Sequence, residues 1–132
     1  MSPVQAERAV LDTSVVIDPG ATPIPGVLAI STATLSELHF GVLVAKKPEV
    51  RAERLRRLSV IQRQFDALPI DDAVAASYGR LAAAVVDAGR TPRGRTMDLL
   101  IAATAHAHGA SLVTRNPKDF RGLEALVTVV PV

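Results

Sequence analysis

Four carboxylates stand where acidic side chains could act together on a metal ion. Asp12 follows a short apolar run, Glu37 lies in a stretch of helical spacing, and Asp98 opens the most apolar segment of the chain. Asp119 comes shortly after a second apolar run, which ends at Thr114. A carboxylate near an apolar core is unfavourable unless it is hydrogen-bonded or bound to a cation. Clustered carboxylates suit Mg²⁺ or Mn²⁺, and these ions can activate water and stabilise the leaving oxygen when a phosphodiester bond is cleaved.

Each acid also has an ordinary structural interpretation. Asp12 could accept hydrogen bonds from the amides of a turn, and Glu37 could simply face solvent. Asp98 could stabilise the N-terminus of its helix, and Asp119 could cap the turn that leads to Phe120. Sequence spacing leaves open whether the four carboxylates converge.

Apolar runs of strand length alternate with segments of helical periodicity. Strands are expected at 9–11, 27–30, 67–70, 111–114 and 127–130. Helices are expected from Ser31 or Thr32 to the break at Lys47-Pro48, over 50–65, from Asp71 or Asp72 to Gly89, and over 96–106. This alternation predicts an α/β fold around a parallel sheet, in which ligands bind beyond the carboxyl ends of the strands. Asp12, Thr114 and Asn116 are expected at those ends.

The helix at 50–65 carries both an apolar stripe and much of the positive charge. The stripe is expected to bury Leu55, Leu58, Ile61 and Phe65, which recur every three or four residues. Residues 46–63 hold seven Lys and Arg against two Glu, and residues 90–95 hold three Arg and no acid. These charges indicate either solvated helix faces or a surface that binds a polyanion.

Composition narrows the class of protein. The chain has 132 residues, 48% of them hydrophobic, which predicts a single domain over residues 1–132 with a substantial core. It has no Cys, which excludes disulfides and Cys-ligated metal centres, and only four aromatic residues, which argues against base-stacking RNA-binding platforms. The N-terminus does not resemble a signal peptide, and no apolar run is long enough to cross a membrane. A cytoplasmic protein is therefore expected.

Four segments together resemble a known family. They are Val10–Asp18 (VLDTSVVID), Leu35–Gly41 (LSELHFG), Met97–Ala105 (MDLLIAATA) and Val113–Phe120 (VTRNPKDF). Each is a weak signal alone, but their order and spacing resemble PIN-domain proteins from about residue 9 to residue 129. The length and the single-domain form are most similar to the VapC-type toxins of VapBC toxin–antitoxin pairs.

The resemblance implies a fold, an activity and a set of partners. The fold is a PIN-like three-layer α/β structure with a parallel sheet of about five strands flanked by helices. The activity is that of a Mg²⁺- or Mn²⁺-dependent endoribonuclease, with transfer RNA as one expected substrate. The partners are a second copy of the chain and a VapB-type antitoxin, which would insert a cationic side chain near the acids and occupy a groove between the helix after Ser31 and the helix at 50–65.

The resemblance also assigns roles to residues of this chain. The first three catalytic acids fall on Asp12, Glu37 and Asp98, with Asp12 and Asp98 as the metal ligands. The fourth acidic role is given to Asp119. Supporting roles go to Asn116, which can donate and accept hydrogen bonds, and to Thr13 and Thr114, whose hydroxyls can orient water.

The loop before Asp98 and the end of the strand at Thr114 suggest where RNA phosphates bind. Arg93 and Arg95 lie a few residues before Asp98, and Arg115 follows Thr114. These three arginines are expected to offset the repulsion between the acids and the RNA backbone.

Two functions other than that of a ribonuclease are also considered for this sequence. A catalytically weak RNA-binding PIN module would be expected to lack a core acid, whereas Asp12, Glu37 and Asp98 are all present. A receiver-like phosphoacceptor domain would be expected to carry paired acids after its first strand, whereas Asp12 is followed by Thr13 and Ser14.

Overall fold

Five parallel strands form one sheet at the centre of the protein. The computed structural model describes residues 7–132. The strands are β1 (Arg8–Leu11), β2 (Val27–Ser31), β3 (Ala67–Leu68), β4 (Ser111–Thr114) and β5 (Val129–Pro131). Their order is β3-β2-β1-β4-β5, and every neighbouring pair is parallel. The predicted α/β fold with a parallel sheet of five strands is confirmed.

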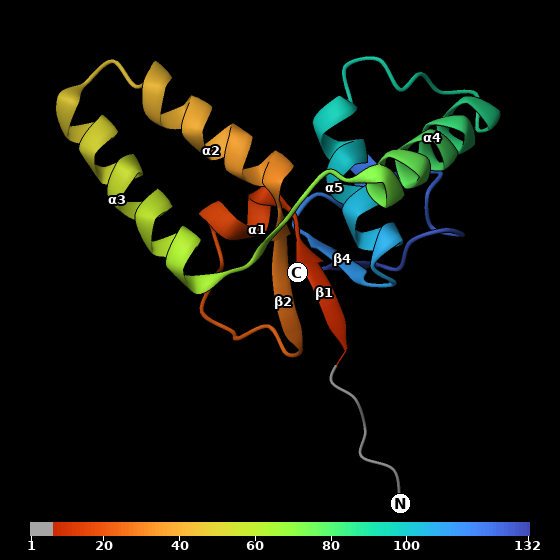
Figure 1. The fold of residues 1–132 in the computed structure, drawn as a ribbon, viewed down its shortest axis with the longest axis horizontal. Helices are drawn as coiled ribbons and strands as arrows, with labels where there is room; N and C mark the ends of the chain where they lie inside the picture. Colours follow the sequence, from red (N-terminus) through yellow and green to blue (C-terminus); the bar gives the residue numbers. More distant parts are fainter. Residues whose placement is uncertain (1–6) are drawn as a thin grey trace, which may run out of the picture.

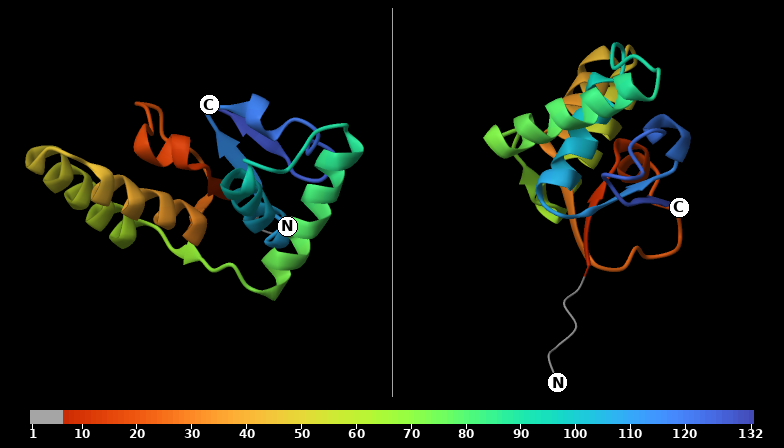
Figure 2. Two further views of the ribbon diagram at one scale, coloured as in Figure 1. Left: turned by 90° about the horizontal axis from the view of Figure 1, so that it is seen from above. Right: turned by 90° about the vertical axis from the view of Figure 1, so that its right-hand side faces the viewer.

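Helices cover both faces of this sheet (Figures 1 and 2). They are α1 (Thr13–Ile17), α2 (Thr32–Val44), α3 (Pro48–Gln64), α4 (Asp72–Asp87) and α5 (Thr96–Ala107), with a short 3-10 turn η1 at Pro117–Phe120. On one face α4 and α5 pack against Val10 and Leu112, and on the other α1 and the end of α3 pack against Leu11 and Val113. Within residues 7–132, no helix is both long enough and apolar enough to span a bilayer.

Local sequence signals fix most of the helix ends. The Ser31 side chain accepts a hydrogen bond from the Ala33 amide at 3.1 Å, and that of Asp71 accepts one from the Val74 amide at 3.0 Å. Both side chains satisfy amides that the first turn of a helix leaves free, as predicted. Helix α4 is followed by Gly89, whose φ of 78° suits glycine.

Three expected boundaries were wrong. Helix α3 begins at Pro48 rather than residue 50, because the first helical position needs no amide hydrogen. Strand β5 begins at Val129, because the amide of Val127 is taken by a turn bond to the Leu123 carbonyl at 2.9 Å. The strand expected at 67–70 is reduced to two residues at the edge of the sheet, because Pro69 has no amide hydrogen with which to continue the ladder. The sequence reasoning also missed α1, the five-residue helix directly after Asp12.

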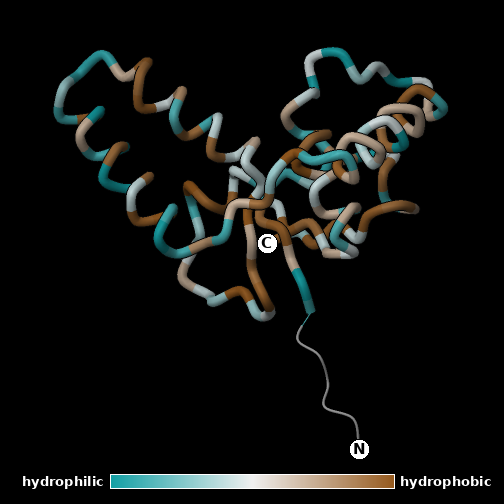
Figure 3. Tube along the Cα trace, in the orientation of Figure 1, coloured by the Kyte–Doolittle hydropathy of each residue, from teal (hydrophilic) through white to brown (hydrophobic). Residues whose placement is uncertain are grey.

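The two sides of the molecule are packed differently. Helix α5 is buried almost all round, as its composition predicted, and Ile101, Ala102 and Ala103 are fully inaccessible to solvent. Helices α2 and α3 instead form a hairpin that projects from the sheet (Figure 1), and apolar stretches run along it (Figure 3). The side chains of Phe40 and Leu43 on α2 are 67% and 73% exposed.

The predicted stripe of α3 was partly wrong. Leu58 and Ile61 are buried and Phe65 is half-buried, but Leu55 is 53% exposed, because the first half of α3 lies beyond the sheet.

Arginines on α3 complete the hairpin. Arg51 donates to the Ala45 carbonyl at 2.9 Å, and Arg54 donates to the Gly41 carbonyl at 2.7 Å. Both carbonyls lie at the C-terminal end of α2, where helix carbonyls lack partners in their own helix. Part of the positive charge at 46–63 therefore serves this structural purpose.

Candidate active site

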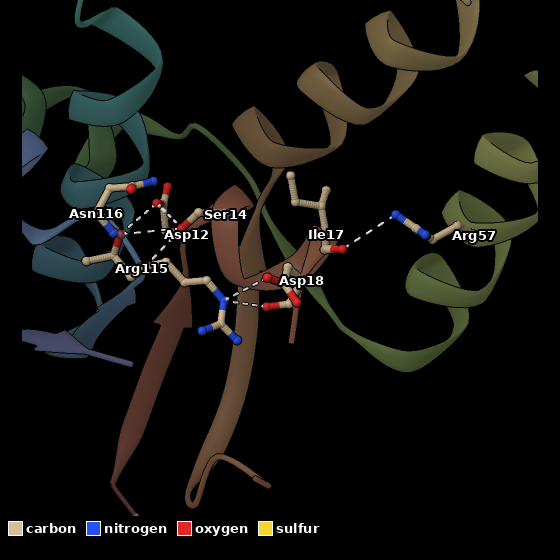
Figure 4. A network of polar contacts seen from close by, with 8 residues as sticks. Asp12, Ser14, Ile17, Asp18, Arg57, Arg115 and Asn116 are labelled. Carbon is tan, nitrogen blue, oxygen red and sulfur yellow. Dashed lines mark hydrogen bonds and ion pairs between the residues drawn. The ribbon is translucent and has the colours of Figure 1, made fainter. Parts of the chain in front are cut away.

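Asp12 lies at the carboxyl end of the central strand and is only 5% exposed. One oxygen of its carboxylate, Oδ2, accepts hydrogen bonds from two hydroxyls, those of Ser14 at 2.7 Å and Thr114 at 2.8 Å (Figure 4). The interpretation in which turn amides bind this carboxylate is therefore wrong. Ser14 was missed by the sequence reasoning, although it stands two residues from Asp12.

Backbone amides orient both hydroxyls. The Arg115 amide donates to Ser14 Oγ at 3.2 Å, and the Asn116 amide donates to Thr114 Oγ1 at 2.9 Å. Because each hydroxyl oxygen already accepts an amide hydrogen, its own hydrogen is directed to Asp12. Within residues 7–132, no hydrogen bond reaches the second carboxylate oxygen of Asp12, which is left for a ligand.

Glu37 is half-buried on α2 and does not simply face solvent. Its Oε1 accepts a hydrogen bond from the Thr13 hydroxyl at 2.7 Å. Thr13 Oγ1 lies 3.0 Å from Thr34 Oγ1, also on α2. The first turn of α1 thus connects the end of β1 to Glu37.

Asp98 lies in the first turn of α5, and no hydrogen bond to its carboxylate is formed by the described residues. It therefore does not cap its helix. Burial first, and then the negative charges of Asp12, Asp119 and Glu37, together raise the pKa of Asp98 to about 6, against the opposing effect of Arg95. All three other acids lie close enough to act on Asp98. The four predicted carboxylates therefore lie in one region of the protein, within electrostatic range of Asp98.

An open hollow lies between Glu37 and Asp98. It has a volume of about 400 Å³ and is also lined by Gly94, Thr96 and Met97. The loop that precedes α5 thus forms one wall of the space that the two acids face. This loop is the one that carries Arg93 and Arg95.

Asp119, given the fourth acidic role, and Asn116, given a supporting one, lie near different acids of the site. Figure 4 shows Asn116 beside Asp12. Asp119 is half-buried in η1 and acts on the charge of Asp98. The site therefore has an amide near Asp12 and a fourth carboxylate near Asp98.

Residues 9–125 match the PIN domain family. The chain belongs to the PIN-domain family. It is 36% identical over 126 residues to Ribonuclease VapC5 of Mycobacterium tuberculosis, an alignment that covers 91% of this chain and 90% of that protein. It is 34% identical over 106 residues to the tRNA(fMet)-specific endonuclease VapC of Shigella flexneri, covering 78% of this chain and 74% of that protein.

Solved structures of the same family share the fold. VapBC-5 from Mycobacterium tuberculosis matches with a TM-score of 0.80 and 35% identity, covering 95% of this chain and 98% of that one. FitAcB from Neisseria gonorrhoeae matches with a TM-score of 0.76 and 27% identity, covering 92% and 96%. The resemblance inferred from the four sequence segments is confirmed.

The arginines of this PIN domain differ in what they contact. Arg95 donates to the main-chain carbonyl of Asp119 at 2.8 Å, so its charge lies at the acid site. Arg93 is exposed on the same loop. Arg115 instead turns toward Asp18, to whose carbonyl its Nε donates and whose carboxylate lies 3.7 Å away (Figure 4). The Arg115 side chain therefore holds the segment after α1.

Gly20 shows how closely that segment approaches Arg115. Its φ is 76°, and a Cβ placed there would lie 2.8 Å from Arg115 Nη2. A hollow of about 530 Å³ opens beneath the loop at 19–25, and none of the four acids lines it. The chemistry of this domain is therefore expected at the smaller hollow beside Glu37 and Asp98.

The donor atoms at the site are carboxylate and hydroxyl oxygens. Within residues 7–132, no three His, Asp or Glu side chains lie close enough together to surround an ion by themselves. His106 does not take part, since its Nδ1 lies 2.8 Å from the Ser77 hydroxyl between α5 and α4. An all-oxygen donor set fits a hard divalent cation that keeps part of its water shell.

Proposed function

We propose that this PIN domain is a divalent-metal-dependent endoribonuclease of the VapC type, formed by the whole chain from residue 1 to residue 132. The observation that carries the proposal is the set of negative charges acting on Asp98, which come from the other three predicted acids. Relatives at 36% and 34% identity are named as a ribonuclease and a tRNA-specific endonuclease. Transfer RNA is accordingly the substrate class we propose.

Asp12 and Asp98 are the residues we assign to the metal ion, Mg²⁺ or Mn²⁺. Mg²⁺ is usually held by one or two carboxylates, with water and substrate phosphate filling its other positions. Asp12 offers the oxygen that its hydroxyl partners leave free, and Asp98 has no partner of its own among residues 7–132. A bound ion supplies activation of water and stabilisation of the leaving oxygen.

The remaining side chains have positioning tasks. Glu37 is fixed at Oε1 by Thr13, so its second oxygen can hold a water molecule in the hollow shared with Asp98 and accept a proton from it. Asp119 adds negative charge beside Asp98. The Asn116 amide, near Asp12, can donate a hydrogen bond to a phosphate oxygen.

The partners follow from the exposed surfaces and from the relatives. The matched structure from Mycobacterium tuberculosis is described as a toxin–antitoxin system. We propose that a VapB-type antitoxin covers the apolar side chains of the α2–α3 hairpin and places a cationic side chain among the acids. A homodimer and a cytoplasmic location are proposed on the same family basis.

A cleavage assay with purified protein and total tRNA tests the function. We expect cleavage with Mn²⁺ or Mg²⁺, none with excess chelator, and a loss of about 10²- to 10³-fold in Asp12→Asn, the range for losing one group that stabilises developing charge. Asp87→Asn, which changes an exposed acid on α4, is the control and should cleave like the parent. Binding of RNA without cleavage by the parent would favour the alternative, a catalytically weak RNA-binding PIN module.

Arg93 and Arg95 are proposed to bind RNA phosphates beside the acids. Replacing both by Ala should weaken RNA binding equally for different sequences and reduce its logarithmic salt dependence by roughly one unit for each lost contact. Arg80→Ala on α4 is the control. Arg115→Ala gives a separate measurement, because that side chain is engaged by Asp18. Unchanged salt dependence in the Arg93/Arg95 double variant would show that these arginines only solvate the loop.

A further inference from the structure

A second threonine hydroxyl lies behind Glu37. Thr34, three residues earlier on α2, is fully buried, and its Oγ1 lies 3.0 Å from Thr13 Oγ1. Thr34 has no assigned role at the site so far. Its side chain faces the first turn of α1 rather than solvent. A buried hydroxyl without a partner would be unfavourable, so the contact with Thr13 has a defined stabilising role.

The direction of the hydrogen bonds follows from counting hydrogens. Each threonine hydroxyl has one hydrogen to donate. Thr13 uses its hydrogen on Glu37 Oε1, at 2.7 Å. The hydrogen between the two hydroxyls must therefore come from Thr34. The result is a chain of donors that runs from Thr34 through Thr13 to the carboxylate of Glu37.

This arrangement parallels the one at Asp12. There, backbone amides fix the Ser14 and Thr114 hydroxyls, which then donate to one carboxylate oxygen. At Glu37 the place of the amide is taken by the Thr34 hydroxyl. Hydrogen bonds in series strengthen one another, and the outer donor also fixes the rotamer of the inner one.

We propose that Thr34 is a positioning residue that acts through Thr13 to hold Glu37 in the orientation needed for RNA cleavage. The effect of Thr34 on cleavage rests on the proposed function. The hydrogen-bond chain from Thr34 to Glu37, in contrast, is present without metal or RNA. Thr34 itself touches neither the metal ion nor the substrate. Its effect should therefore depend on its hydroxyl and on the carboxylate of Glu37.

The first test uses the metal-free protein. Thr34→Val keeps the shape of the side chain and removes the hydroxyl, and Thr34→Ser keeps the hydroxyl. The denaturation midpoints of Thr34→Val, Glu37→Gln and the double variant form a cycle. It should be non-additive, because Gln keeps an acceptor oxygen but loses the negative charge that strengthens the hydrogen-bond chain from Thr34. Ser77→Ala removes a buried hydroxyl between α4 and α5 and is the control, since its effect should add to that of Glu37→Gln.

The second test measures Mn²⁺ binding by calorimetry without RNA, followed by single-turnover cleavage. Loss of a group that orients a residue of a metal site commonly reduces activity by about 10- to 100-fold, and the single-turnover rate of Thr34→Val should fall by that factor. Its Mn²⁺ affinity should change less, because Asp12 and Asp98 are the residues assigned to the ion. Thr34→Ser should behave like the parent, and so should Ser77→Ala. In the Glu37→Gln background, Thr34→Val should cause little further loss.

Three results would overturn the inference. They are additive midpoints for Thr34→Val and Glu37→Gln, a defect in Thr34→Ser as large as that in Thr34→Val, and an undiminished effect of Thr34→Val in Glu37→Gln. If Thr34→Val does not fold, Thr34→Cys replaces it in each comparison, because a thiol is a weak donor of similar size. A parent protein that neither binds Mn²⁺ nor cleaves RNA contradicts the proposed function, while the metal-free cycle still decides the role of Thr34.

Discussion

Helix α5 and the α2–α3 hairpin each deliver one acid to the same site, but they hold it in different ways. Asp98 is placed by the packing of a helix in which Ile101, Ala102 and Ala103 are fully buried, and no hydrogen bond from residues 7–132 reaches its carboxylate. Glu37 stands on a helix that buries few of its side chains, and a hydroxyl fixes its carboxylate. A rigid core can hold an uncompensated acid in place, whereas a loosely packed helix needs a directed hydrogen bond.

The same contrast appears in the apolar side chains outside the site. Helices α4 and α5 bury Leu81, Val85, Leu99 and Ile101 in one core, while Phe40 and Leu43 on α2 are more than half exposed. Arginines of α3 bind carbonyls at the end of α2, but apolar side chains of the hairpin stay exposed. An exposed apolar patch of this kind is typical of a surface that binds a partner.

The largest effect is expected from a substitution at Asp98, the acid that is held by the packing of α5. Asp98→Asn should reduce cleavage by about 10²- to 10³-fold, because it removes a charge from the proposed metal site. The same change should stabilise the metal-free protein at pH 8. Burial and the other acids raise the pKa of Asp98 to about 6, so the folded state binds its proton more tightly than the unfolded state.

The sign of the pH dependence follows from that shift. The stability contributed by the raised pKa is fully present below the unfolded value near 4 and is lost as the pH rises through about 6. At pH 8 the variant should exceed the parent by on the order of 1 kcal/mol, after allowance for solvent screening, and at pH 3 the difference should vanish. Denaturant titrations at both pH values check this. A variant less stable than the parent at pH 8 would mean that Asp98 has a stabilising partner.

Sequence patterns alone identified the candidate acids and the elements that carry them. Asp12 and Asp98 sit beside apolar runs that define a strand and the buried helix, and Glu37 lies in a segment of helical spacing. Glycine, proline and capping residues also marked most element ends, because those residues act on the backbone locally.

Contacts between distant segments could not be found in the same way. Ser14 and Thr114 are 100 residues apart and bind the same oxygen of Asp12, while Thr34 reaches Glu37 only through Thr13. The exposure of Leu55 likewise depends on how far α3 extends beyond the sheet. Periodicity reports that a face is apolar, but it does not report whether another element covers that face.

The next largest effect is expected on the exposed face of the hairpin. Phe40→Asp should weaken binding of the VapB-type antitoxin by about 30-fold or more, the loss of roughly 2 kcal/mol expected when a central aromatic side chain of an interface is removed. Val86→Asp introduces the same charge at a side chain that is 57% exposed on α4, and it is the matched control. Affinity is measured with the VapB-type antitoxin of the proposed pair.

Two further measurements sharpen that result. Cleavage by the free Phe40→Asp protein should equal that of the parent, because Phe40 is exposed and lies outside the acid site. Its denaturation midpoint should also change little, since surface substitutions usually alter stability by less than about 0.5 kcal/mol. Equal antitoxin affinity in Phe40→Asp and the parent would place the interface elsewhere.

The smallest effect is expected where arginine completes the hairpin. Arg54→Met keeps much of the apolar length of the side chain but removes the donor to the Gly41 carbonyl, a bond of 2.7 Å. The loss should be about 1 kcal/mol of unfolding free energy, the usual net contribution of one hydrogen bond. Arg56→Met is the matched control on the same helix, because Arg56 pairs only with exposed Glu53 and such surface pairs contribute little. Denaturant unfolding of the metal-free protein compares the two. If both variants lost the same stability, the arginines of α3 would act through general charge and not through the carbonyls at the end of α2, and the hairpin would then depend on packing as α5 does.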